Sequence, residues 1–131
     1  MLNFKLSELI KSKIAQKENI NNMPDVEELD NLMDLMCYCL QPVRELINKP
    51  MIITSGYRNE KLNAIVKGAK NSQHLKGQAA DFKIDNMKPD EIIAKIKNSN
   101  IIYDQLINEK NQWVHISYNK NKNRKEILKI N

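Results

Sequence analysis

Two short segments that alternate between apolar and polar residues, 79–84 and 113–118, constrain the fold of this chain most. A period of two is that of a β-strand, because successive side chains point to opposite faces of a sheet. One face of each strand is therefore apolar and suited to a core. The other face carries Asp81 in the first strand and His115 in the second. If the two strands lie near one another, these two side chains look into the same cleft.

Helical spacing dominates the first part of the chain. Ser7 predicts the cap of a short first helix, whose apolar side would be Leu6, Leu9, Ile10 and Ile14. Pro24 and the acidic residues after it start a long amphipathic helix that reaches about Asn48, with a kink near Pro42. Met33 and Met36 lie on its apolar stripe, and we interpret them as core residues.

The remaining elements are short. We predict a buried strand at residues 51–54, helices at 59–66 and 89–97, and strands at 103–108 and 113–118 joined by a polar turn. Helices that precede a small, mostly antiparallel sheet are typical of an α+β domain, with the helices packed on one face of the sheet. A chain of 131 residues without an internal repeat or a low-complexity linker predicts one domain over 1–131, which we expect to be a monomer.

The net charge of +5 is concentrated at the C-terminus, where residues 118–131 carry +4 of it. The rest of the chain is close to neutral and has no basic stripe interleaved with aromatic residues. We therefore interpret 118–131 as a basic, solvated tail and expect no specific nucleic-acid binding.

The sequence has no apolar run long enough to span a membrane, and its first residues lack the apolar region of a secretory signal. We therefore expect synthesis in the cytoplasm and no membrane insertion. Cys37 and Cys39 lie two apart on a predicted helix and point to different faces, so they cannot form a disulfide with each other. Both are interpreted as small buried apolar residues of a reducing compartment.

Both histidines of the chain, His74 and His115, belong to one constellation with Asp81. Two imidazoles and one carboxylate are a ligand set that leaves zinc one open coordination position. Gly77, between His74 and Asp81, allows the tight turn by which a loop histidine and a strand aspartate meet one ion. Ser72 is expected to hydrogen-bond within that turn or to support a ligand. The pattern predicts one Zn²⁺ ion, although the residues also suit other divalent ions.

Charged residues near the predicted cleft are candidates for chemistry. Arg58 follows a strand end and a glycine turn, so it can enter the cleft and hold a carboxylate or polarise a carbonyl, or else form a surface ion pair with Glu60. Hydrolysis also needs a general base. Glu109, at the start of the turn before His115, is the first candidate and Asp104 the second, because Gln112 cannot accept a proton.

Taken together, these motifs resemble the M15 zinc peptidases, the D-Ala-D-Ala carboxypeptidase-like group that includes phage endolysins and cell-wall endopeptidases. The resemblance rests on the segments Ser55–Arg58, Ser72–Asp81, Asp104–Glu109 and Trp113–Ser117. Leu6–Ile10 and Leu40–Leu46 also fit the short phage members, so it covers about residues 4–118. It implies a hedgehog/D-Ala-D-Ala-peptidase fold of the short phage type, with zinc on the two histidines and the aspartate. It also implies Arg58 in the substrate cleft, where we expect Tyr57, Ser72 and Trp113 to contact the substrate as well.

The implied activity is hydrolysis of an amide bond in a peptidoglycan stem peptide, either at a terminal D-Ala-D-Ala or at an internal link. Several branches of the family carry a catalytic acid three residues before the last histidine ligand, where this chain has Gln112. The related hedgehog fold has a glutamate six residues before it, which corresponds to Glu109 here. The alternative is a non-catalytic, zinc-containing module that binds cell wall or protein. A lysin released by a holin or by lysis, and a cytoplasmic recycling enzyme, both agree with the absence of a signal sequence.

Overall fold

The computed structural model describes residues 2–131 and confirms the α+β class. The helices are α1 (Leu6–Ile10), α2 (Lys13–Lys17), α3 (Val26–Leu35), α4 (Gln41–Ile47), α5 (Glu60–Ile65) and α6 (Pro89–Lys97). A π-helical segment, η1 (Met36–Leu40), joins α3 to α4, and a 3₁₀ turn, η2 (Gln73–Lys76), precedes the second strand. The strands are β1 (Ile52–Ser55), β2 (Ala79–Lys83), β3 (Gln105–Glu109), β4 (Trp113–Ser117) and β5 (Glu126–Ile130).

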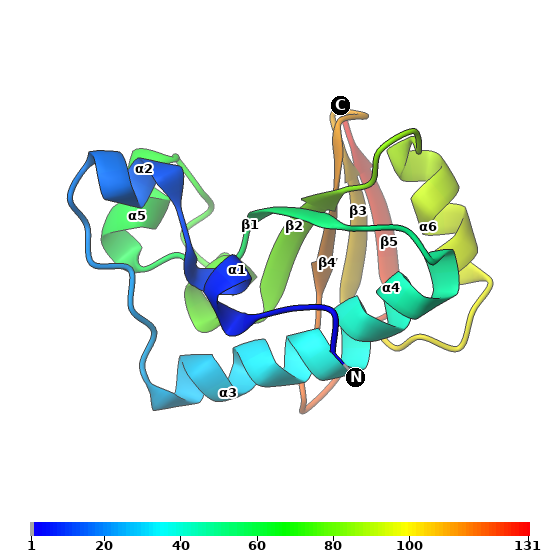
Figure 1. Cartoon of the computed structure of the whole chain (residues 1–131), viewed down its shortest axis with the longest axis horizontal. Helices are drawn as coiled ribbons and strands as arrows, with labels where there is room; N and C mark the ends of the chain where they lie inside the picture. The colour runs from blue at the N-terminus through cyan, green and yellow to red at the C-terminus, as the bar shows by residue number, and fades with distance from the viewer. Residues whose placement is uncertain (1) are drawn as a thin grey trace.

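The five strands form one sheet in the order β1-β2-β4-β3-β5 (Figure 1). Every neighbouring pair is antiparallel except β3 and β5, which are parallel. The two strands with the clearest alternation, β2 and β4, are therefore direct neighbours at the centre of the sheet. The sheet thus brings together the two polar faces that the sequence predicted.

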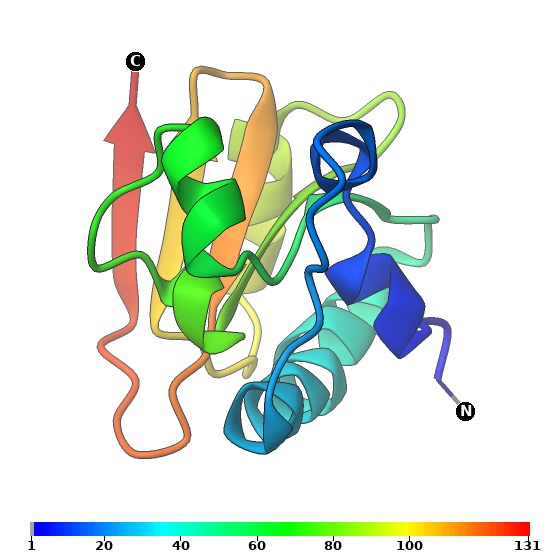
Figure 2. The ribbon, with the colours of Figure 1, turned by 90° about the vertical axis from the view of Figure 1, so that its left-hand side faces the viewer.

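The core lies between the sheet and α3, η1, α4 and α6. The inward side chains of the two central strands, such as Phe82 and Ile116, have no exposed surface. They pack with helix residues that include Leu35, Leu40 and Ile96. The short helix α5 lies over the opposite face of the sheet from α6 (Figure 2). Four of the five residues of each central strand are buried, so the polar face of β2 and β4 is covered as well as the apolar face that packs against these helices.

The predicted long helix is present as α3, η1 and α4 in succession, and it ends at Ile47. The π-helical turn ends two residues before Pro42, and the Gln41 N–H that follows it donates to the Met36 carbonyl. Proline has no N–H and disrupts the regular ladder, so the irregular turn occurs where the kink was expected. The interpretation of Met33 as a core residue is wrong, because it is 40% exposed while Met36 is buried.

The N-terminal helix differs from the prediction. Ser7 lies inside α1, and the N-cap position before that helix is taken by Lys5, whose N–H donates to the Glu8 carboxylate. The helix ends at Ile10, and Ser12 caps a separate helix, α2, by accepting a hydrogen bond from the Ala15 N–H. Ile14 therefore belongs to α2 and is partly exposed. The apolar spacing was correct for α1, but a capping serine five residues later restarts the helix.

The edges of the sheet also differ from the prediction. β1 is an edge strand with exposed and half-buried residues, so the expectation of a buried strand at 51–54 is wrong. At the other edge, the expected solvated tail contains β5, which pairs with all five residues of β3. Backbone hydrogen bonds to a neighbouring strand order this segment even though most of its side chains are exposed.

The two cysteines lie in different environments. Cys39 is fully buried and donates its thiol to the Ile102 carbonyl at 3.0 Å, and burial raises the pKa of that thiol far above its usual range. Cys37 is exposed, so its interpretation as a buried residue is wrong. Within residues 2–131, no helix is both long and apolar enough to cross a membrane.

Candidate metal centre

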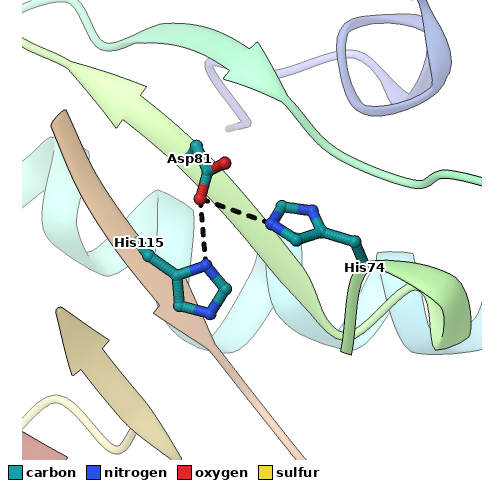
Figure 3. Close-up of side chains that lie close together, drawn as sticks. All are labelled: His74, Asp81 and His115. Carbon is teal, nitrogen blue, oxygen red and sulfur yellow. Dashed lines mark hydrogen bonds and ion pairs between the residues drawn. The ribbon is translucent and has the colours of Figure 1, made fainter. Parts of the chain in front are cut away.

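His74, Asp81 and His115 meet at one point (Figure 3). The Oδ1 atom of Asp81 lies 3.3 Å from Nε2 of His74 and 2.9 Å from Nδ1 of His115. All three side chains are buried, and their ligand atoms lie within 4.8 Å of one another. Within residues 2–131 this is the one group of His, Cys, Asp and Glu side chains with the geometry to hold a metal ion.

The register of the sheet places two of the three ligands. Asp81 on β2 is the direct antiparallel partner of His115 on β4. Directly opposed residues in an antiparallel pair point to the same face of the sheet. Their apolar sequence neighbours are buried on the other face, so both polar side chains must stand on the face that α5 and η2 cover. The predicted convergence of these two residues is therefore confirmed.

The η2 turn supplies the third ligand, His74. Ser72 caps the turn, because its hydroxyl accepts a hydrogen bond from the His74 N–H at 3.1 Å. Gly77 ends the turn with φ of +74°, a left-handed conformation that glycine adopts without the steric cost of a Cβ atom. The roles expected for Ser72 within the turn and for Gly77 are thus present in the structure.

The donor atoms fit a divalent cation. With bonds of about 2.0–2.1 Å, the ligands of tetrahedral zinc stand about 3.3 Å apart, close to the two distances around Asp81. Nδ1 of His74 lies 2.7 Å from the Gly56 carbonyl, which can only accept, so that nitrogen carries a proton and Nε2 is the atom left to face a metal ion. Burial alone would raise the pKa of Asp81, but the hydrogen bonds from His115 and His74 outweigh it and hold that pKa well below its usual range. The carboxylate is therefore ionised, as a metal ligand must be.

The three ligands line a cleft of about 650 Å³. Arg58, Glu109 and Trp113 line it too, as do Ser72 and Ile107. Within residues 2–131, the buried Nε atom of Arg58 and the Nε1 atom of Trp113 have no hydrogen-bond partner. A cleft of this size is within the range that accommodates small molecules or a few residues of a peptide.

Arg58 is held at the cleft by its backbone. Its N–H donates to the His74 carbonyl at 3.1 Å, and its Nη2 atom lies 3.5 Å from the Ser72 hydroxyl. The buried side chain of Asn22 fixes the same loop, because it donates to the Tyr57 carbonyl and accepts from the Asn59 N–H. Burial lowers the pKa of Arg58, while the negative charges of Asp81 and Glu109 raise it. The guanidinium therefore lies in the field of two carboxylates, one of them a candidate metal ligand.

The sequence of the whole domain agrees with this geometry. The family model for Peptidase M15 matches residues 2–117. The chain belongs to the M15 peptidase family. Peptidases of this family are zinc-dependent, which agrees with the buried His-Asp-His group. A search of curated proteins finds no significant match.

The two candidate bases of this M15 peptidase occupy different environments. Glu109, the last residue of β3, pairs with Trp113 and lines the cleft. Asp104 is only 2% exposed; its Oδ1 atom accepts a hydrogen bond from Arg124, and its Oδ2 atom accepts from Arg124 and Gln73. These bonds hold the pKa of Asp104 below its usual range despite its burial. The geometry therefore favours Glu109, whose carboxylate faces the cleft, over Asp104.

One predicted site residue lies elsewhere. The ring of Tyr57 is buried in the hydrophobic core, and the residue lines a neighbouring groove along β1 instead of the metal cleft. A tyrosine next to a strand end is as well suited to core packing as to substrate contact, and Tyr57 packs in the core.

Among the residues that line the cleft of this M15 domain, sequence reasoning did not single out the polar residues Gln73, Lys110 and Arg124. Arg124 was assigned to a solvated tail, and only the pairing of β5 with β3 brings it to the site. Gln73 stands next to a ligand and could have been noticed for that reason. Lys110 lies in the β3–β4 turn, with its ammonium 6.0 Å from the ring centre of Trp113.

Proposed function

We propose that this protein is a zinc-dependent peptidase that hydrolyses an amide bond in a peptidoglycan stem peptide. The proposal rests on one observation above all. Two imidazole nitrogens converge on one carboxylate oxygen in the same cleft that holds Arg58 and Glu109. Membership of the M15 family supports a peptidase, and the chemistry of the three donors supports zinc.

His74 through Nε2, His115 through Nδ1 and the Asp81 carboxylate would hold the ion. When bound, zinc acts as a Lewis acid and lowers the pKa of a coordinated water to about 7. The protein itself supplies the proton transfers. Glu109 accepts a proton from the attacking water and then delivers it to the nitrogen of the leaving amine.

Arg58 is proposed to stabilise negative charge. Its guanidinium lines the cleft, has a donor without a partner among residues 2–131, and is oriented by the loop that follows β1. As the carbonyl oxygen of the scissile bond becomes negative, a fixed cation next to it lowers the barrier. Ser72 and Trp113 border the same space and are proposed to contact the peptide.

The substrate and its location complete the proposal. We propose that the peptide comes from peptidoglycan and that the protein reaches the wall after holin-type release or lysis. We propose that it acts as a monomer, since one chain supplies all three candidate ligands and no second chain is needed to complete the site. Mass spectrometry of muropeptides after digestion would identify the bond, whether terminal D-Ala-D-Ala or an internal link.

The decisive variant is Glu109→Gln, which preserves shape and removes the proton acceptor. We expect it to bind zinc like the wild type and to digest purified peptidoglycan roughly 10²- to 10⁴-fold more slowly. The matched control is Glu27→Gln, the same change on the exposed surface of α3, which should digest at the wild-type rate. Unchanged hydrolysis by Glu109→Gln excludes Glu109 as the base.

The same experiment separates the peptidase from a binding module. Gln112 stands where several M15 branches carry their acid, which is the specific reason to consider a chain that has lost catalysis. A wild-type protein that binds zinc and retains peptidoglycan, but releases no muropeptide fragment, would be such a module.

A further inference from the structure

The C-terminal segment lies beyond the part of the chain that the family model matches, which ends at residue 117. It adds β5 to the edge of the sheet, parallel to β3 (Figure 2). It also brings Arg124, which precedes β5, to the rim of the metal cleft. Extension of the sheet by β5 does not require Arg124 to contact the cleft. The contacts of Arg124 near the candidate ligands therefore point to a second role for this segment.

Arg124 donates three hydrogen bonds to Asp104. Its backbone N–H and its Nε atom donate to Oδ1 at 2.9 and 2.8 Å, and its Nη2 atom donates to Oδ2 at 2.9 Å. This bidentate arrangement is the strong and geometrically specific form of an arginine–carboxylate pair. Asp104 is almost completely buried, so the pair is sheltered from solvent on the carboxylate side.

Asp104 in turn holds Gln73. The Nε2 atom of Gln73 donates to Oδ2 of Asp104 at 2.9 Å. An ionised carboxylate can only accept, so this contact fixes which way the amide of Gln73 points. Gln73 begins η2, and its carbonyl also accepts a hydrogen bond from the Gln78 N–H that closes the turn. The chain of contacts therefore runs from Arg124 through Asp104 to the residue next to His74.

These contacts restrain η2 from a different side than the other hydrogen bonds that hold it. Ser72 and the Gly56 carbonyl restrain His74 from the loops around β1 and η2. The Arg124–Asp104–Gln73 contacts tie the same turn to the residues that lie just before β3 and β5. A ligand must be held within about 0.5 Å to bind its metal well, and that requires support from more than one side.

We propose that Asp104 and Arg124 are positioning residues that act through Gln73 to hold His74 in its metal-binding position. The C-terminal segment then contributes to the metal centre by supporting one of its candidate ligands. The inference rests on the metal-binding part of the proposed function and not on peptidase activity.

The test measures zinc affinity by competition with a chromogenic chelator, in the full-length chain. Arg124→Ala and Gln73→Ala should each weaken zinc binding by about tenfold, the lower end of the effect of residues that orient metal ligands. Arg124→Lys should recover only part of the affinity, because lysine keeps the charge but not the bidentate geometry. Lys129→Ala is the matched control: it removes the other ion pair of this segment, with Asp90, which lies away from η2 and should leave the affinity unchanged.

A double variant makes the test independent of general loss of stability. If Arg124 acts through Gln73, then Arg124→Ala combined with Gln73→Ala weakens zinc binding no more than the stronger single variant. Losses that multiply, or wild-type affinity in Arg124→Ala, would overturn the inference. So would a higher KM with unchanged zinc affinity, which would make Arg124 a substrate contact. A wild-type chain with no zinc affinity would instead contradict the proposed function itself.

Discussion

Gly77→Ala tests directly whether the turn that carries His74 is as tightly constrained as the structure indicates. Gly77 has φ of +74°, and an added Cβ would stand 2.4 Å from the Glu28 carbonyl oxygen on α3. An alanine in the left-handed conformation costs roughly 1–2 kcal/mol. The contact with a backbone oxygen adds roughly 1–3 kcal/mol, because either η2 or α3 must shift.

Together these effects predict a loss of about 2–5 kcal/mol of unfolding free energy. For a chain of this length the unfolding entropy is about 0.28 kcal/mol per degree, so Tm should fall by about 7–18 °C. The shift that relieves the contact also moves His74, and zinc affinity should fall by about 10- to 100-fold. Thermal unfolding with a chelator present gives the first quantity, and zinc competition gives the second.

Gly68→Ala is the control for this prediction. Its Cβ would also meet a close atom, at 2.1 Å, but that atom is Oδ1 at the end of the Asn63 side chain, which can turn at the cost of the hydrogen bond from its Nδ2 atom to the Ala69 carbonyl. We expect a loss of at most about 1 kcal/mol, the value of one hydrogen bond, and unchanged zinc affinity. Equal losses in the two variants, or wild-type zinc affinity in Gly77→Ala, would show that the reasoning about the turn is wrong.

Three further predictions concern the surroundings of the site. In the native protein, an alkylating reagent should label Cys37 and leave Cys39 unmodified until unfolding, as counted by intact mass, because burial keeps the Cys39 thiol protonated. Asp104→Asn should cost about 2 kcal/mol at neutral pH. Because the hydrogen bonds from Arg124 lower the pKa of Asp104, the stabilisation is complete above the ordinary carboxyl range and is lost as the pH falls through the depressed pKa. Urea unfolding should therefore show the wild type and this variant converging below about pH 4, and a constant difference would contradict the ion pair. Asn22→Ala should cost roughly 1–3 kcal/mol in the same assay and should slow hydrolysis, since Asn22 hydrogen-bonds to the backbone on both sides of Arg58.

The central strands and the ligands could be predicted because their signals are local. Period two in 79–84 and 113–118 separates a core face from a polar face, and the polar residues are of the types that bind zinc. What the sequence could not supply was the register. Only the structure shows that Asp81 and His115 are direct partners and that Glu109 shares the cleft.

The predictions that proved wrong concern residues whose structure depends on long-range contacts. Residues 126–130 do not alternate cleanly, and basic residues surround them, so nothing local distinguishes a fifth strand from a tail. Its order comes from pairing with β3, and that pairing also explains why Arg124 was missed. The exposure of Met33 and Cys37 has a similar cause. A helical stripe predicts which side faces the core, but not how wide the buried face is, and Met33 and Cys37 lie at its edge while Leu32, Met36 and Cys39 beside them are buried.

The central claim is that one metal ion is held by His74, Asp81 and His115. Calorimetric titration of the metal-stripped protein with zinc tests it most directly, with Asp81→Ala beside the wild type and circular dichroism to confirm that both are folded. We predict one zinc ion per wild-type chain and no measurable binding by the folded variant. Undiminished binding by Asp81→Ala would contradict the claim.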